Sequence, residues 1–212
     1  MFDECPGCGE VHTDMPVDGT ASVLRCPNCG HEQSVSREPL LVVSGASAAG
    51  KSAVLRELRG TREDVVLLDS DTIWREELWD DFEWFFQTWL RLCRDIAQSG
   101  RPPVVFGAGF GVPSNLESHA QYDCFSRVEH LVLVCDGDEQ ERRLRDRPPG
   151  RHPAEFGTDD DDIAEQVEFN RWLREAADES DFAVVDTTEA TVETAADRVD
   201  RWITAQTGGE RR

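Results

Sequence analysis

The stretch from residue 45 to residue 52 has the residue types and spacing of a phosphate-binding loop. It reads Gly45, Ala46, Ser47, Ala48, Ala49, Gly50, Lys51 and Ser52, which is the pattern G-x-x-x-x-G-K-[ST]. Glycine at both ends lets the backbone turn tightly and approach a phosphate chain, with successive N–H groups pointing into one concavity. Lys51 can reach the β- and γ-phosphates of ATP, Ser52 can ligate Mg²⁺, and the small residues between leave room for the nucleotide. We therefore predict that these residues bind ATP and that Ser52 holds Mg²⁺.

Two carboxylates follow the apolar run 65–68, which is predicted to be a strand. They are Asp69 and Asp71, and we expect them to face the phosphates from beside the loop, because ligands of open α/β sheets bind at the carboxyl ends of strands. One can hold the Mg²⁺ shell through water, and the other can orient or deprotonate an attacking hydroxyl. The same residues also fit a plain Asx turn and helix N-cap. We predict catalytic roles for Lys51, Asp69 and Asp71, with the division between the two aspartates left open.

Five arginines lie between residues 142 and 151 of a strongly acidic chain: Arg142, Arg143, Arg145, Arg147 and Arg151. One interpretation is ion pairing on a helix surface. The other is a lid, in which a helix ends at the prolines and swings its arginines over the transferred phosphate. The lid hypothesis predicts a catalytic role for Arg147 and nucleotide contacts for Arg151 and then Arg143.

Four cysteines near the start of the chain have the spacing of a structural zinc site. Cys5 and Cys8 form one C-x₂-C pair, and Cys26 and Cys29 form another after seventeen residues. Glycine follows each pair, so the backbone can fold back and its N–H groups can support the sulfurs. Four thiolates close the tetrahedron, so the zinc is predicted to be structural. The alternatives are two disulfides or a redox pair.

The composition narrows the possible partners. The chain has 212 residues and a net charge of −21, which argues against a general DNA- or RNA-binding surface. Lys51 is its only lysine, which together with the acid excess suggests a high-salt organism, although a GC-rich genome also favours arginine. We find neither a secretory leader nor an apolar run of transmembrane length, and so expect a cytoplasmic protein. Nothing in the sequence indicates the oligomeric state.

Strands and helices alternate along the rest of the chain. Apolar runs at 40–43, 65–68, 104–106, 131–134 and 182–185 predict five strands, separated by helical segments. This order predicts an α/β fold with three layers, in which helices cover both faces of a five-stranded parallel sheet. We place a zinc ribbon at 1–36 and the domain with the phosphate-binding loop at 37–212.

The segment 72–93 is predicted to be a long helix and is unusually aromatic. Helical spacing assigns most of its rings to a core face. An alternative is an acceptor pocket, with Arg75 on an anionic group and rings from Trp74, Trp79, Phe82 or Phe86 against a flat substrate. The three glycines after the third strand, Gly107, Gly109 and Gly111, suggest a close backbone approach to the same acceptor.

These motifs together resemble the small-molecule kinases of the P-loop superfamily, namely the nucleoside monophosphate, shikimate, gluconate and adenylylsulfate kinase types. The resemblance covers residues 40 to about 204 and rests on the loop, the D-x-D of Asp69 and Asp71, the glycines after the third strand, and the R-x-x-x-R segment from Arg143 to Arg147. It implies that the loop binds ATP and Mg²⁺, that the D-x-D binds magnesium and the acceptor, and that the arginines clamp phosphates. It also implies that Thr187, after the fifth strand, lies by the adenine.

The resemblance is weaker on the acceptor side. The segment after Asp71 differs from the acceptor helix of each of these kinases, and the zinc ribbon lies at the N-terminus instead of within the lid. The chain is also similar to a set of uncharacterised P-loop ATP-binding proteins that share W-L-R-L-C at 89–93 and F-N-R-W-L at 169–173.

The leading hypothesis is an ATP-dependent phosphotransferase acting on a small-molecule acceptor, possibly a nucleoside or nucleotide. The alternative is an ATP-binding switch or adaptor whose zinc ribbon docks a protein or nucleic-acid partner. A guanine-binding N-K-x-D motif is impossible, because the only lysine lies in the loop. The acidic charge disfavours a third hypothesis, a kinase acting on nucleic-acid ends.

Overall fold

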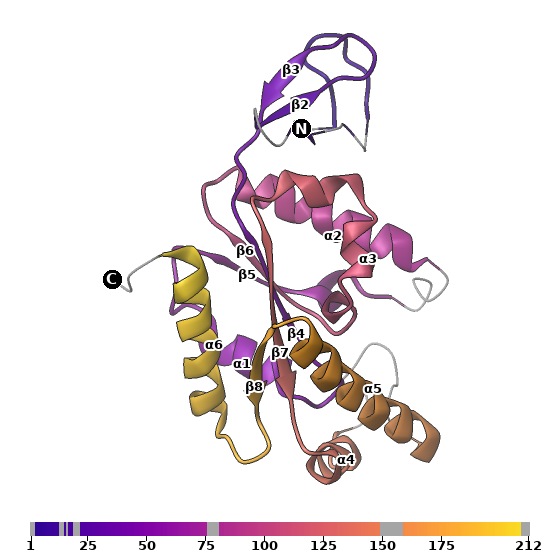
Figure 1. Cartoon of the computed structure of the whole chain (residues 1–212), viewed down its shortest axis with the longest axis vertical. Coiled ribbons are helices and arrows are strands. Elements are labelled where there is room, and N and C mark those ends of the chain that lie inside the picture. Colours follow the sequence, from indigo (N-terminus) through magenta and orange to yellow (C-terminus); the bar gives the residue numbers. More distant parts are fainter. Residues whose placement is uncertain are drawn as a thin grey trace.

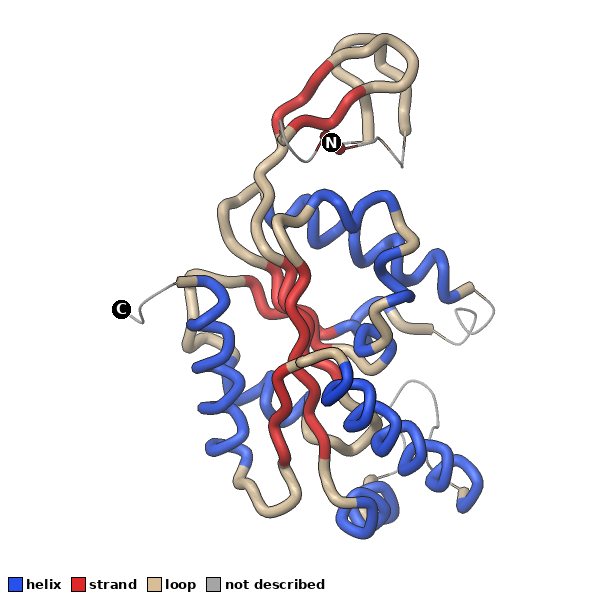
Figure 2. The backbone as a smooth tube through the Cα atoms, in the orientation of Figure 1, coloured by secondary structure: helices blue, strands red, loops and turns tan. Residues whose placement is uncertain are grey.

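The computed structural model describes residues 3–12, 15, 17–18, 22–75, 81–148 and 159–208. Its main sheet has five parallel strands in the order β5-β6-β4-β7-β8 (Figures 1 and 2). The strands are β4 (Leu40–Ser44), β5 (Val66–Asp69), β6 (Pro103–Phe106), β7 (Val128–Val134) and β8 (Ala183–Asp186). This confirms the predicted parallel sheet.

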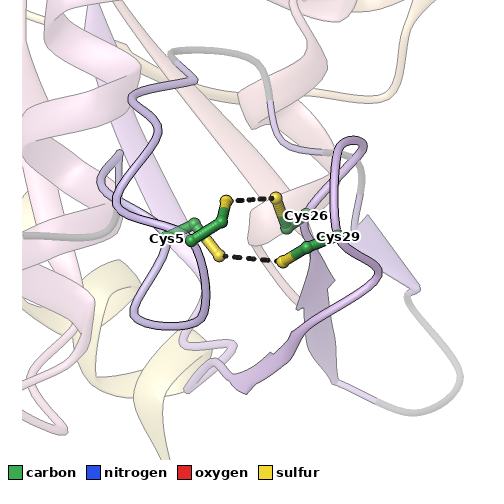
Figure 3. A group of neighbouring side chains, drawn as sticks. Cys5, Cys26 and Cys29 are labelled. Carbon is green, nitrogen blue, oxygen red and sulfur yellow. Dashed lines mark hydrogen bonds between the residues drawn. The ribbon is translucent and has the colours of Figure 1, made fainter.

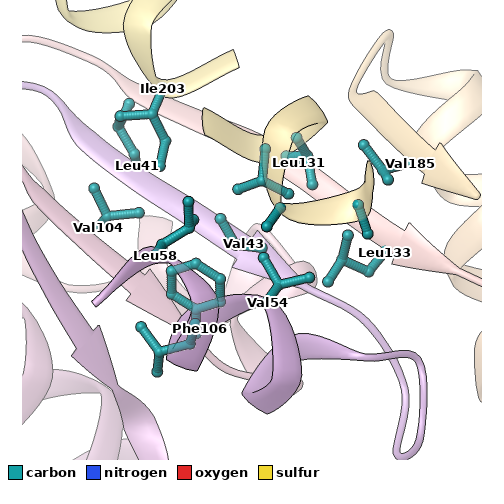
Figure 4. Close-up of a cluster of buried hydrophobic side chains, with 14 of the residues drawn as sticks. Leu41, Val43, Val54, Leu58, Val104, Phe106, Leu131, Leu133, Val185 and Ile203 are labelled. Carbon is teal, nitrogen blue, oxygen red and sulfur yellow. The ribbon is translucent and has the colours of Figure 1, made fainter. Parts of the chain in front are cut away.

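Helices cover both faces of the sheet. One face carries α1 (Lys51–Leu58) and α6 (Val192–Thr207), and the other carries α2 (Phe82–Ala97) and α5 (Asp160–Glu179). Because both faces are covered, the central strand β4 is apolar and buried along its length, apart from the serine that ends it. Figure 4 shows the core on the α1 and α6 face, where Val43 and Leu131 pack with Val54 and Ile203. The three-layer fold class predicted from the sequence is therefore confirmed.

Short elements complete the carboxyl edge and the α2 face of the sheet. Helix α4 (Gly137–Arg145) follows β7 and begins after Asp136, whose side chain accepts a hydrogen bond from the Asp138 N–H. The remaining short elements are η1 (Ser70–Ile73), η3 (Gly109–Gly111), α3 (Ser114–Glu117) and η4 (Ala120–Cys124). No described helix is both long and apolar enough to cross a membrane.

The prediction of one helix over 72–93 is wrong at its start. The chain after β5 forms the 3₁₀ turn η1, and α2 begins only at Phe82, where the Asp81 side chain accepts a hydrogen bond from the Trp84 N–H. Aspartate is a favoured N-cap residue, but the aromatic spacing on which the prediction rested continued on the N-terminal side of Asp81. Trp79 lies outside the described residues.

The N-terminal segment forms a separate three-stranded antiparallel sheet from β1 (Val17–Asp18), β2 (Val23–Arg25) and β3 (Glu32–Ser34). It lies at the amino ends of the main strands, away from α4 (Figure 1). The buried carboxylate of Asp3 joins it to α2 through Arg91 at 2.5 Å and Arg94 at 3.1 Å. The domain boundary at residue 36 stays a prediction.

Candidate active site

A cavity of about 740 Å³ opens at the carboxyl edge of the sheet. Its walls combine the predicted phosphate-binding loop, the D-x-D segment, the last turn of α4, the turn after β8, and the facing sides of α1 and α6. The predicted site residues that line it are Ser47, Ala48, Gly50, Lys51, Ser52, Asp69, Asp71, Arg143, Arg147 and Thr187. Residues from distant parts of the chain thus meet where a parallel sheet places its ligands.

The backbone of the loop has the strained geometry that its glycines permit. Gly45 has φ +149°, and a Cβ there would lie 2.5 Å from the Leu133 carbonyl oxygen, so its close approach is to β7. Gly50 has φ +105° immediately before α1. Ala46 and Ala49 are buried in the hydrophobic cores and do not line the cavity, so the small size of these two residues serves packing.

Lys51 is the first residue of α1, and its Nζ donates to the carbonyl oxygens of Gly45 at 2.7 Å and Ala46 at 2.9 Å. Burial lowers the pKa of Lys51 to about 8, although the charge of Asp71 and, more weakly, of Asp69 acts in the opposite direction. Lys51 and the two predicted carboxylates therefore line one cavity, as binding of Mg²⁺ and a triphosphate there requires.

Asp69 and Asp71 reach this cavity from an edge strand. The β6 strand lies between β5 and the loop strand β4, so the aspartates are one strand further from the loop than the expected position beside it. The Asp69 side chain caps η1 by accepting the Asp71 N–H at 3.2 Å. The turn interpretation thus applies to Asp69, while both residues also line the cavity with Lys51. Their carboxylates and the Ser52 hydroxyl are oxygen donors of the kind that Mg²⁺ binds.

The described arginines from residue 142 to residue 147 form ion pairs, line the cavity, or do both. Arg142 pairs with Glu139 and Asp146, and Arg145 pairs with Glu141 and Asp160, as helix-surface ion pairs. Arg142, Arg143 and Arg147 line the cavity, and the charge of Arg147 contributes to lowering the pKa of Lys51. The role of these arginines as a lid stays a prediction. The predicted phosphate contact of Arg151 lies outside the described residues.

Arg143 is anchored to the turn after β8. It donates to the Thr187 carbonyl oxygen at 2.6 Å, to the Thr187 hydroxyl at 3.1 Å, and to Glu139 at 2.7 Å. The Thr187 hydroxyl also lies 3.1 Å from the carbonyl oxygens of Ala49 and Val134, to either of which it can donate. Thr187 therefore supports the loop while forming part of the cavity wall.

Sequence reasoning missed two glutamines that contact the loop. Gln140 of α4 and Gln166 of α5 hydrogen-bond the backbone of Ser47. No motif marks them, because each is a single polar residue within an ordinary helix, and only the packing of α4 and α5 against the loop reveals them.

The expected acceptor side is more closely packed than predicted. A Cβ on Gly107 would meet the Ser70 hydroxyl at 2.4 Å, and one on Gly111 would meet the Ser44 hydroxyl at 2.6 Å. These two glycines therefore accommodate neighbouring side chains, which removes their suggested approach to an acceptor. The rings of Trp74 and Phe86 belong to the core on the α2 face.

Phe82 and Trp84 at the start of α2 remain exposed. The Arg75 guanidinium lies 5.9 Å from the Trp84 ring centroid, which is a cation–π distance. Arg75 and Trp84 do not line the cavity described above.

The four N-terminal cysteines come together as the spacing predicts. Their sulfurs all lie within 4.8 Å of one another, with Cys5 and Cys29 at 3.5 Å and Cys8 and Cys26 at 3.7 Å. Figure 3 shows the side chains of Cys5, Cys26 and Cys29 converging. A tetrahedron with zinc–sulfur bonds of about 2.3 Å has sulfur–sulfur edges of about 3.8 Å, so the donor set fits zinc. None of the four is in a disulfide.

The turns that present these thiolates have the expected backbone. Gly9 and Gly30 have φ of +74° and +72°, and the Gly7 N–H donates to the Cys5 sulfur at 3.3 Å. His12 pairs with Glu10, and neither His12 nor His31 belongs to the cysteine cluster.

No family model matches the sequence, and no curated protein matches it. The fold does match solved structures. A sugar kinase from Janibacter sp. HTCC2649 superposes with a TM-score of 0.56 over 79% of this chain and 94% of that chain, at 14% identity. Thymidylate kinase from Candida albicans gives a TM-score of 0.54 over 84% and 96% of the two chains, at 10% identity. The chain therefore has the fold of P-loop kinases, and at these identities the substrate stays open.

Proposed function

We propose that this protein is an ATP-dependent kinase that transfers the γ-phosphoryl group to a small-molecule acceptor. The observation that carries the proposal is the shared cavity, in which Lys51, Ser52, Asp69, Asp71 and Arg147 line one space at the carboxyl edge of the sheet. Both structural neighbours reported above are named as kinases of small molecules, which supports the same reaction class.

The proposed role of each residue follows from its charge. The loop amides and Lys51 would hold the β- and γ-phosphates, and Arg147 would face the charge that develops during transfer. Mg²⁺, held through Ser52 and the aspartates, would supply charge neutralisation. One aspartate is then left to accept or orient the proton of the attacking hydroxyl. No side chain needs to form a covalent intermediate, since in-line transfer depends on positioning.

The acceptor itself is proposed only by class. The proposed class is a nucleoside or nucleotide, because a flat base can stack on the exposed rings of Phe82 and Trp84 and an anionic group can pair with Arg75, all of which lie outside the cavity wall. The four cysteines are proposed to hold a structural zinc ion. We further propose a cytoplasmic location and domains at 1–36 and 37–212.

The test compares the wild type with Lys51→Ala and Asp71→Asn in ATP turnover with a panel of acceptors. Lys51→Ala should abolish turnover while the protein keeps its zinc, measured by metal analysis. Asp71→Asn should lower turnover at least about 100-fold with a smaller effect on ATP affinity. Full turnover by Lys51→Ala would exclude the proposed site. An adaptor, in contrast, would bind ATP and release no acceptor-dependent ADP.

A further inference from the structure

Side chains hold both backbone polar groups of Ser47 in the phosphate-binding loop. The Ser47 N–H donates to Gln166 Oε1 at 3.0 Å, and the Ser47 carbonyl oxygen accepts from Gln140 Nε2 at 2.9 Å. The Gln140 amide also donates to the Gln166 carbonyl oxygen at 3.0 Å, which joins α4 to α5 at the same point. Gln140 is fully buried, so water does not compete for these bonds.

The orientation of the Gln140 amide is fixed by its partners. Both atoms near its Nε2 are carbonyl oxygens, which only accept hydrogen bonds. A flipped amide would place its own oxygen against two other oxygens. Gln140 is therefore a required donor at this position, whereas Gln166 serves the loop only as an acceptor.

The neighbouring peptides of the loop are held in the same way. Lys51 donates to the carbonyl oxygens of residues 45 and 46, Arg143 lies 3.4 Å from that of Ala48, and the Thr187 hydroxyl lies 3.1 Å from that of Ala49. Side chains thus contact the carbonyl oxygen of every residue from 45 to 49. With these carbonyl oxygens held by side chains, the N–H groups at the start of α1 are left to face an anion.

The loop also needs this support because its backbone is strained. Ala48 has φ +63°, a left-handed conformation that residues with a Cβ rarely adopt. Such a residue keeps its conformation only when the surroundings over-determine it. Gln140 holds the peptide group immediately before Ala48 through its carbonyl oxygen, and Gln166 holds the preceding peptide group through its N–H.

We propose that Gln140 and Gln166 are positioning residues that hold the phosphate-binding loop in its anion-binding shape, with Gln140 the essential donor. The inference rests on the proposed function, because it assigns a role in binding the phosphates of ATP. It also makes α4 a fixed wall of the cavity, since Gln140 ties this helix to the loop and to α5. The predicted swinging motion then excludes Arg143, which lies on α4.

The test uses Mg²⁺–tripolyphosphate, which binds only through its phosphates, and adenosine, which has no phosphate. Both are titrated by calorimetry into the full-length, zinc-loaded protein. Gln140→Leu, which keeps the size of the side chain and loses its donor, should weaken tripolyphosphate binding at least about tenfold. Adenosine affinity should change less than about twofold, because a ligand without phosphate does not depend on the backbone of Ser47.

A matched pair of variants separates hydrogen bonding from charge. Gln140→Glu and Gln166→Glu each place a carboxylate beside the backbone of Ser47, but only Gln166→Glu keeps the acceptor that the Ser47 N–H needs. Gln140→Glu should therefore lose at least about tenfold more tripolyphosphate affinity than Gln166→Glu. Equal losses would mean that charge alone acts and would overturn the inference.

Other results would also overturn it. Wild-type affinity of Gln140→Leu for tripolyphosphate would contradict the inference. An equal loss of tripolyphosphate and adenosine affinity in this variant would also contradict it, because an equal loss indicates general destabilisation. Should the Gln140 variants fail to fold, Gln166→Ala replaces them, with an expected loss of about threefold or more that Gln166→Glu reverses. Wild-type protein that binds neither ATP nor tripolyphosphate would instead contradict the proposed function, and the role of the glutamines with it.

Discussion

Lys51 shows how a single residue is tuned by opposing influences. Burial disfavours its charged form, and the two aspartates that share the cavity favour it. The result is a pKa of about 8, well below the 10.5 of an ordinary lysine. At neutral pH the ammonium is still charged, but it loses its proton within a range that an experiment can reach without unfolding the protein.

The first prediction follows from this pKa. ATP affinity should be highest below pH 8 and should fall above it by up to about tenfold per pH unit, because the neutral amine no longer attracts phosphate. Calorimetric titrations between about pH 7.5 and 9.5 measure this. Lys51→Arg is the control, since arginine stays charged throughout the range. A parallel decline in Lys51→Arg would assign the effect to another group.

His130 of β7 supplies a second prediction, concerning stability. It is buried and stacks on Phe182 at 4.6 Å, and burial lowers its pKa from 6.5 to about 4. Below pH 6.5 the unfolded chain therefore binds a proton at His130, whereas the native chain binds this proton only near pH 4. The free energy of unfolding should fall over this window by at most about 3 kcal/mol. Urea unfolding at about pH 7 and pH 4.5 measures it.

His130→Phe is the matched variant, because it keeps a ring against Phe182 and removes the titrating group. It should lose less stability than the wild type between the two pH values. An identical loss in both proteins would show that carboxylates alone govern the acid sensitivity.

What the sequence could predict at this scale depends on whether a motif carries the residue. The loop, the D-x-D and the cysteine pairs have fixed spacings that follow from phosphate and metal geometry, so their convergence in space was predictable. Gln140 has no such signature, and its role depends on which helix packs beside Ser47. Gly107 has no such signature either, because a side chain there would collide with Ser70, which is distant in the sequence.

At the scale of elements, the strands were predictable because parallel strands covered on both faces are continuous apolar runs. Their order in the sheet was not predictable in the same way. The hydrophobic pattern of each segment does not show that β6 lies between β5 and β4. The sequence therefore did not reveal that the D-x-D segment follows an edge strand. The start of α2 was misplaced because aromatic spacing continued past the cap at Asp81.

The N-terminal ribbon is the element expected to depend most on the proposed zinc ion. Among its described residues, the apolar contacts form a small cluster in which Met15, Leu24 and Val35 pack against Cys124 of η4. So small a core cannot offset the chain entropy of ordering the segment. The proposed zinc ion would supply the remaining stability.

The third prediction is that a zinc chelator unfolds the ribbon and leaves the P-loop domain folded. Limited proteolysis should then cut before about residue 37, and ATP affinity should stay within about threefold of the untreated protein, because the ribbon lies at the opposite edge of the sheet from the cavity. Cys26→Ser should behave like the chelated protein. Loss of ATP binding together with the zinc would show that the two regions are coupled.

At the scale of the whole molecule, charge is the dominant feature. The chain has 43 acidic and 22 basic side chains, yet its cavity collects a lysine and several arginines around the proposed phosphate site. Because the net charge is −21, the acidic side chains repel one another in the compact state. Salt reduces this repulsion over a distance that shortens as ionic strength rises.

The fourth prediction follows from this excess of acidic groups. The melting temperature of the protein should rise as potassium chloride increases from about 0.1 M to about 2 M, since screening weakens the self-repulsion. Differential scanning calorimetry across a salt series measures it. A melting temperature that is constant or falls with salt would contradict the high-salt interpretation of the composition.

The most direct test of the account is acceptor-dependent release of ADP from Mg²⁺–ATP at high salt, measured for the wild type and for Asp71→Asn across nucleosides, nucleotides and other small hydroxyl compounds. The account predicts that at least one acceptor raises ADP release by the wild type well above its rate with water alone, and that Asp71→Asn abolishes this increase. Wild-type protein that binds ATP tightly but releases no additional ADP with any acceptor would contradict phosphoryl transfer.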